Sequence, residues 1–215
     1  MISRPDFIFL DFDGVIMDSM ALKLESYCHA FDGLGFSKDA IRLLQLSSAG
    51  LSRQKTIPLM YESLAGKPMP EDLFAMALAR FGAHDDASRS RMALMPGAAE
   101  FLAAAREGGT RLAVVTGTPQ DVIEKTVAHF HLGGFFTRVC GTPGGKAQHL
   151  DRMLKEFSVF ADRCLFVGDA IKDQEAALAV GMPFAGIDSH PDPFVREGAL
   201  MRIRDLGDLV PALRA

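Results

Sequence analysis

The stretch Phe7-Ile8-Phe9-Leu10-Asp11-Phe12-Asp13-Gly14 decides the fold of this chain. Its four leading apolar residues predict a central strand that is buried on both faces. Side chains alternate along a strand, so Asp11 and Asp13 point to the same side where it ends. Two neighbouring carboxylates repel each other unless a cation lies between them or one takes a proton. Open α/β sheets bind ligands at the carboxyl ends of their parallel strands, so this stretch predicts a ligand site.

The composition places limits on the class of protein. The 215 residues suffice for one large domain or a domain with an insert, and 48% of them are apolar. The net charge is −4 and there is no basic run of five or more, which argues against a nucleic-acid partner. We expect a monomer or a homodimer.

The N-terminal region and the cysteines indicate a cytoplasmic protein. The first apolar run is too short for a signal peptide and is broken by acids, and no apolar stretch reaches membrane-spanning length. We therefore expect no membrane association. Cys28, Cys140 and Cys164 lie far apart in the sequence, so we expect buried free thiols in a reducing compartment.

The part of the chain after the first strand has helical spacing of its apolar residues and no convincing strand between Val15 and Arg91. It predicts a separate all-helical domain over residues 16–92, with residues 1–15 and 93–215 forming the core. The helices expected in this insert are Met17–Phe31, Lys38–Leu46, Ser52–Leu64 and Glu71–Phe81.

The second half of the chain alternates between strands and helices, which predicts an α/β fold with a doubly wound parallel sheet and helices on both faces. The expected strands are Arg111–Thr116, Phe135–Cys140, Cys164–Val167 and Phe184–Ile187. The expected helices are Ala98–Glu107, Pro119–Phe130, Lys146–Phe157, Asp173–Val180 and Leu206–Leu213, with a turn-rich loop at Asp188–Pro193.

Chemically reactive side chains fall at or just after four strand ends. They are Asp11 with Asp13, then Thr116-Gly117-Thr118, then Lys146, then Asp169 with Asp173. Because the carboxyl ends of parallel strands share one edge of the sheet, these groups are expected to meet in one cleft. A hydroxyl, a lysine and up to four carboxylates suit a divalent cation and a phosphoryl group.

The same segments resemble the four motifs of the haloacid dehalogenase superfamily, in the family's order. The similarity is greatest to the branch with a helical cap after the first strand, which includes phosphoglycolate phosphatase and β-phosphoglucomutase. The matching segments are Asp11–Ser19, Val114–Gly117, Lys146, and Val167–Asp173 with Ala176–Met182, and Met95-Pro96-Gly97 resembles the return from the cap to the core.

This resemblance implies a role for each residue. Asp11 would be the nucleophile that forms an aspartyl-phosphate, and Asp13 would act first as general acid and then as general base. Thr116 and the backbone N–H of Gly117 would hold the phosphoryl oxygens, and Lys146 would balance their charge. Asp11, the backbone carbonyl of Asp13 and Asp169 would supply oxygens to Mg²⁺, and Asp173 would complete the metal site through water or orient Lys146.

Several of these residues also have plainer interpretations. Thr116 fits an ordinary strand-end threonine, and Asp173 fits a first-turn acid that the helix dipole favours. Lys146 fits a solvated lysine, and Ala147 follows it where the family usually has proline. Arg53 lies in a segment that resembles the cap loop of this branch, so it is expected either to bind a second anionic group of the substrate or to be solvated.

The resemblance implies a Mg²⁺-dependent phosphatase of small phosphorylated metabolites. A phosphomutase would share every core residue and is the main alternative. A dehalogenase would lack the second acid, so Asp13 argues against it. A receiver-type phosphoprotein would carry its phosphorylated acid on the third strand, whereas Arg111–Thr116 contains no Asp.

Overall fold

The computed structural model describes residues 4–188 and 201–214. The chain forms two compact units, a core unit of Met1–Asp18 with Leu94–Ala215 and a cap unit of Ser19–Ala93. The predicted division placed the breaks after residue 15 and before residue 93. Within the described residues, no helix is both long and apolar enough to cross a membrane.

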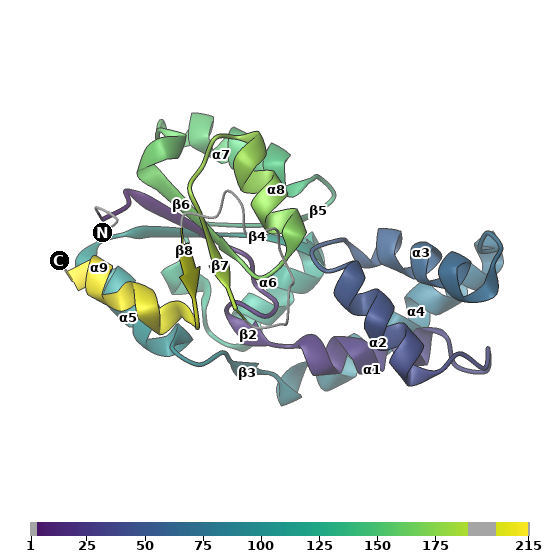
Figure 1. Cartoon of the computed structure of the whole chain (residues 1–215). Helices are drawn as coiled ribbons and strands as arrows, with labels where there is room; N and C mark the ends of the chain where they lie inside the picture. Colours follow the sequence, from purple (N-terminus) through teal and green to yellow (C-terminus); the bar gives the residue numbers. More distant parts are fainter. Residues whose placement is uncertain (1–3, 189–200, 215) are drawn as a thin grey trace. The chain divides into compact units, whose positions relative to one another are not determined.

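The core unit is built on a six-stranded parallel sheet (Figure 1). Its strands lie in the order β5-β4-β1-β6-β7-β8, which is 3-2-1-4-5-6 when these six strands are counted along the chain. They are β1 (Phe7–Leu10), β4 (Arg111–Pro119), β5 (Arg138–Thr142), β6 (Cys164–Gly168), β7 (Phe184–Ile187) and β8 (Met201–Ile203). This order is that of the doubly wound fold, so the predicted fold class is confirmed.

The central strand β1 is the most deeply buried, and its four residues are at most 1% exposed. It pairs with β4 on one side and with β6 on the other. Successive strands are added on one side of β1 as far as β5 and then on its other side from β6 onward. The sheet's topological switch therefore lies between β1 and β6, where open α/β folds bind ligands.

Helices cover both faces of the sheet. Figure 1 shows α7 (Lys146–Glu156) and α8 (Ile171–Ala179) on one face and α5 (Ala98–Gly108) with α9 (Val210–Arg214) on the other. The remaining core helix is α6 (Gln120–His129), and short 3₁₀ turns occupy Gly133–Phe135, Ala161–Arg163 and Leu206–Leu209. Phe7 and Phe9 of β1 pack in one apolar cluster with residues of α7 and α8.

The cap unit contains four helices, as the sequence predicted. They are α1 (Met20–Ala30), α2 (Lys38–Ser47), α3 (Arg53–Ala65) and α4 (Glu71–Ser88), with a 3₁₀ turn at Arg89–Arg91. The unit has its own apolar core, which includes Phe31, Ile41, Ile57 and Phe81. The strands β2 (Met17–Asp18) and β3 (Ala93–Leu94) form a two-stranded sheet where the insert begins and ends.

Some predicted boundaries were wrong. The strand β2 lies in the region expected to contain none, and two residues are too few to produce a recognisable pattern. The helix expected to stop at Phe81 continues through Gly82 to Ser88, and Asp85 in this extension is buried and paired with Arg53 of α3. The strand expected from Phe135 begins at Arg138, and β8 was not predicted. The predicted loop after Asp188 lies outside the described residues.

Candidate active site

Asp11 lies at the carboxyl end of β1, beside the topological switch. Its backbone N–H donates to the carbonyl of Val167 on β6, at 2.9 Å, which extends the β1–β6 pairing into the loop. The side chain is 6% exposed, and its Oδ1 accepts a hydrogen bond of 2.7 Å from the N–H of Phe12. The carboxylate is therefore fixed by the backbone that follows the strand.

Gly14 allows Asp169 to approach the β1 loop. Its φ is +79°, a left-handed conformation that other residues resist. A Cβ at this position would lie 2.3 Å from Oδ2 of Asp169. Both the backbone angle and the space thus require glycine.

Lys146 opens α7, and its ammonium group bridges two carboxylates. Its Nζ lies 2.7 Å from Oδ2 of Asp11 and 2.5 Å from Oδ1 of Asp173. The side chain is only 7% exposed, so the interpretation as a solvated lysine is wrong. Lys155, further along the same helix, is exposed and pairs with Asp151. The structure thus brings Lys146, and not Lys155, to the carboxylates.

Asp173 lies in the first turn of α8 and is completely buried. Its Oδ2 accepts a hydrogen bond of 3.1 Å from the N–H of Ala170, while Oδ1 contacts Lys146. A Cβ on Gly168 would lie 2.4 Å from its Cγ, so this glycine makes room for the carboxyl group. Asp173 is a first-turn acid, but its carboxyl is held inside the site.

Asp11, Asp169 and Asp173 would carry three negative charges if all were ionised, and Lys146 would neutralise only one of them. Burial, followed by the repulsion of Asp11 and Asp173, raises the pKa of Asp169 well above its ordinary value. Burial raises the pKa of Asp173 to about 7 even though Lys146 opposes the shift. Burial alone would lower the pKa of Lys146, but the charges of Asp11 and Asp173 outweigh it and raise that pKa.

Three carboxylates in this cluster fit a hard divalent cation. Asp11, Asp169 and Asp173 each offer an oxygen within 4.8 Å of the others. Carboxylate oxygens are the ligands that Mg²⁺ prefers, and a bound cation would relieve the repulsion that raises the pKa of Asp169. Asp13 is expected in the metal set through its backbone carbonyl, and its side chain is not in this group.

The carboxyl end of β4 supplies two hydroxyl groups. Oγ1 of Thr116, which is buried, accepts a hydrogen bond of 3.2 Å from the N–H of Thr118. Oγ1 of Thr118 donates to Oδ2 of Asp13 at 2.9 Å. Gly117 lies between them and is half-buried. The sequence placed Thr118 in a strand-end segment with polar side chains but gave it no role. Its partner Asp13 lies 105 positions away in the chain, so no local pattern reveals the contact.

Arg53 opens α3 of the cap unit and is buried. Its Nη2 lies 3.1 Å from Oδ2 of Asp85, and its guanidinium carbon lies 4.6 Å from the ring centre of Phe81. The interpretation as a solvated arginine is therefore wrong. Asp85 was missed because the helix that carries it was expected to end at Phe81.

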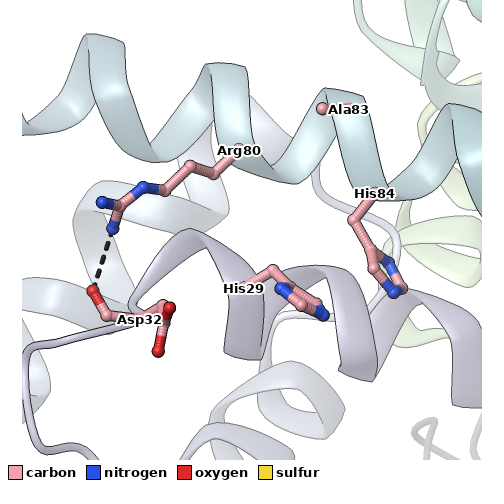
Figure 2. Close-up of a pocket in the computed structure, with 5 residues that line it drawn as sticks. All are labelled: His29, Asp32, Arg80, Ala83 and His84. Atoms are coloured by element: carbon pink, nitrogen blue, oxygen red, sulfur yellow. Dashed lines mark hydrogen bonds between the residues drawn. The ribbon is translucent and has the colours of Figure 1, made fainter.

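The cap unit also contains a pocket of about 360 Å³ between α1 and α4, shown in Figure 2. The rings of His29 and His84 stack there with their centres 4.2 Å apart. Nη1 of Arg80 donates to the backbone carbonyl of Asp32 at 2.9 Å. None of these residues was singled out from the sequence.

The fold and the four strand-end segments define one family. The family model for haloacid dehalogenase-like hydrolases matches residues 8–187, and the chain belongs to this family. The expected resemblance is thus confirmed.

Sequence relatives include both phosphatases and a kinase. The tyrosine-protein kinase PtkA of Mycobacterium tuberculosis is 24% identical over 183 residues, which cover 83% of this chain. The alignment spans 60% of that kinase, so this chain matches less than two thirds of its length. Phosphoglycolate phosphatase 1 of Pseudomonas aeruginosa is 23% identical over 215 residues, covering 96% of this chain and 79% of that protein.

Solved structures share the whole fold. A predicted phosphoglycolate phosphatase from Haemophilus somnus has a TM-score of 0.83 at 21% identity and covers 98% of this chain and 99% of that one. The CbbY protein of Rhodobacter sphaeroides, solved in complex with phosphate, has a TM-score of 0.76 at 21% identity and covers 98% of this chain and 100% of that one. These similarities establish the fold.

Proposed function

We propose that this chain is a Mg²⁺-dependent phosphatase that hydrolyses a small phosphomonoester through an aspartyl-phosphate on Asp11. The observation that carries the proposal is the buried cluster at the end of β1. There the Asp11 carboxylate lies 2.7 Å from Lys146, within a group of three carboxylates at the sheet's switch point. Such an arrangement suits a nucleophile that must accept a transferred phosphoryl group.

In the first step, a carboxylate oxygen of Asp11 forms a bond to phosphorus while the ester P–O bond breaks. Asp13 gives its proton to the departing alcohol oxygen, which receives the electron pair of that bond. In the second step, water attacks phosphorus, Asp13 takes its proton, and the bond from Asp11 to phosphorus breaks to release inorganic phosphate. Asp11 and Asp13 are then ready for another cycle.

The residues around Asp11 suit the charge that spreads over the phosphoryl oxygens in both transition states. Lys146 supplies a fixed positive charge beside Asp11. The hydroxyl of Thr116 and the N–H of Gly117 are the proposed hydrogen-bond donors. Because Lys146 is buried and paired with Asp173, its position costs no rearrangement when the substrate arrives.

Asp11, Asp169 and Asp173 would hold the magnesium ion, with the backbone carbonyl of Asp13 as a further oxygen. When bound, the ion would neutralise charge on the phosphoryl oxygens. In this arrangement Asp173 also orients Lys146, as their 2.5 Å contact indicates.

The proposed substrate class rests on the relatives. Several curated relatives are phosphoglycolate phosphatases, which supports a small, anionic phosphomonoester. Arg53 remains a proposed contact for a second anionic group, although it already pairs with Asp85.

The test measures phosphate release from a panel of phosphomonoesters, with Mg²⁺ and with chelator, by wild type, Asp11→Asn and the control Asp151→Asn. Asp151 is an exposed carboxylate on α7 that pairs with Lys155. We expect Mg²⁺-dependent turnover that Asp11→Asn abolishes and Asp151→Asn preserves, together with a phosphorylated Asp11 peptide after rapid acid quenching.

Wild-type turnover by Asp11→Asn would refute the mechanism. No release from any ester, combined with isomerisation of a sugar phosphate when a bisphosphate activator is added, would show the phosphomutase instead. Binding of Mg²⁺ is measured separately by calorimetry, so that loss of the ion and loss of the nucleophile are distinguished.

A further inference from the structure

Thr118 contacts the proposed general acid directly. Its Oγ1 lies 2.9 Å from Oδ2 of Asp13, and the two residues are 105 positions apart in the chain. The backbone N–H of Thr118 also donates to Oγ1 of Thr116, at 3.2 Å. One residue of β4 is thus bonded both to the acid on the β1 loop and to the proposed phosphoryl-binding hydroxyl.

The direction of these bonds follows from the chemistry of the groups. An ionised carboxylate only accepts hydrogen bonds, so the Thr118 hydroxyl must donate its single hydrogen to Asp13. The N–H of Thr118 occupies a lone pair of Thr116, which leaves the hydroxyl hydrogen of Thr116 available for a phosphoryl oxygen. The Thr118 hydroxyl therefore has a defined orientation before substrate binds.

We propose that Thr118 is a positioning residue that holds Asp13 by Oδ2, so that the catalytic proton is carried and delivered by Oδ1. This inference rests on the proposed phosphatase function. When Asp13 is protonated on Oδ1, Oδ2 is still an acceptor and the bond from Thr118 persists. The proton leaves Oδ1 for the alcohol oxygen as the P–O bond breaks, and Oδ1 later takes a proton from water.

The inference predicts that Thr118 matters most when the departing alcohol needs a proton. The test compares kcat/KM for the best alkyl phosphate of the panel with kcat/KM for p-nitrophenyl phosphate, whose leaving group departs without protonation. Loss of a charged hydrogen bond that aligns the acid should lower kcat/KM for the alkyl ester about 10- to 100-fold in Thr118→Val. The loss with p-nitrophenyl phosphate should be at least about tenfold smaller.

Two further variants separate positioning from structural damage. Thr118→Ser keeps the hydroxyl and should restore the alkyl ester rate to within about threefold of wild type. Thr126→Val removes another buried hydroxyl, one that donates to the Val122 carbonyl within α6, and should leave both rates unchanged. If Thr118→Val does not fold, Thr118→Ala is measured in its place.

Equal losses on the two esters, or no loss on either, would overturn the role of Thr118. Failure of Thr118→Ser to restore activity would do the same. Asp13→Asn is measured in parallel to test the proposed function itself. If Asp13→Asn keeps full activity on the alkyl ester, the proposed acid is wrong whatever Thr118 shows. If Asp13→Asn is inactive but Thr118→Val is not, only the positioning inference fails.

Discussion

Replacing Lys146 with methionine should destabilise the core unit more than the same replacement of an exposed lysine. The Lys146 ammonium is the positive charge between Asp11 and Asp173, at 2.7 and 2.5 Å, and the three side chains are 7%, 6% and 0% exposed. Removing one partner of a buried ion pair costs about 3–5 kcal/mol, because the remaining charges stay buried without compensation. We expect this loss in the free energy of unfolding of Lys146→Met in the presence of chelator.

The matched control is Lys155→Met on the same helix. Lys155 is 75% exposed and pairs with Asp151 one helical turn away, an arrangement worth only about 0.3–0.5 kcal/mol. The two substitutions remove the same side chain from α7, so their difference isolates the buried contacts. It should reach about 3 kcal/mol, or roughly a hundredfold in the unfolding equilibrium.

The cost of Lys146→Met should also depend on pH. Asp173 has a folded-state pKa of about 7 against an ordinary 3.8, so the stability it contributes at acidic pH is lost as pH rises towards 7. Without Lys146 this pKa rises further, and the loss extends to higher pH. The difference between wild type and Lys146→Met should therefore be larger at about pH 8.5 than at about pH 5.5.

The assay is hydrogen exchange of β1 and β4 peptides in increasing urea, with chelator present. The chain has no tryptophan and its two tyrosines lie in the cap unit, so intrinsic fluorescence would report on the wrong unit. A cost no greater than that of Lys155→Met, or one that does not change with pH, would refute the electrostatic reasoning.

Three further predictions concern other parts of the chain. Arg53→Met should lower the free energy of unfolding of the cap unit by about 3–5 kcal/mol, because Asp85 stays buried without its partner. Tyrosine fluorescence in urea measures this loss. An unchanged stability with a raised KM would instead favour a substrate contact. A thiol-reactive dye should modify Cys28 in the native protein before Cys164, whose pKa burial raises to about 11, and equal rates would contradict this burial. Burial lowers the pKa of His149 below 6.5, so the unfolded chain binds a proton that the native one does not, and the free energy of unfolding should fall as pH drops below 6.5. His149→Gln should make this fall less steep. Identical urea midpoints for wild type and His149→Gln at every pH would contradict the prediction.

The sequence was sufficient to predict the core fold and the convergence of four strand ends. Each of these depends on a local pattern that repeats, such as the apolar run before Asp11 or the alternation of strands and helices. The position of Lys146 beside the carboxylates could be predicted for the same reason, since a parallel sheet brings the residues that follow its strands to one edge.

The parts that could not be predicted depend on distant partners. Arg53 opens a helix at a position where a cation is disfavoured, and its burial is explained by contacts with Phe81 and with Asp85, 32 residues away. Thr118 is part of the site because it donates a hydrogen bond to Asp13, which lies 105 residues earlier. The strand β8 has three residues and is defined by pairing with β7, so its own sequence contains little signal.

The position of β1 has a consequence for how the chain folds during synthesis. This strand is made before the other five strands of its sheet, and its two neighbours begin only at Arg111 and Cys164. Until β6 has been made, the four apolar residues of β1 lack one of the strands that cover them, whereas the four cap helices follow one another directly in the chain. The cap unit can therefore fold on the ribosome while β1 is still unpaired. In that interval β1 is open to wrong strand pairing and is a binding site for chaperones.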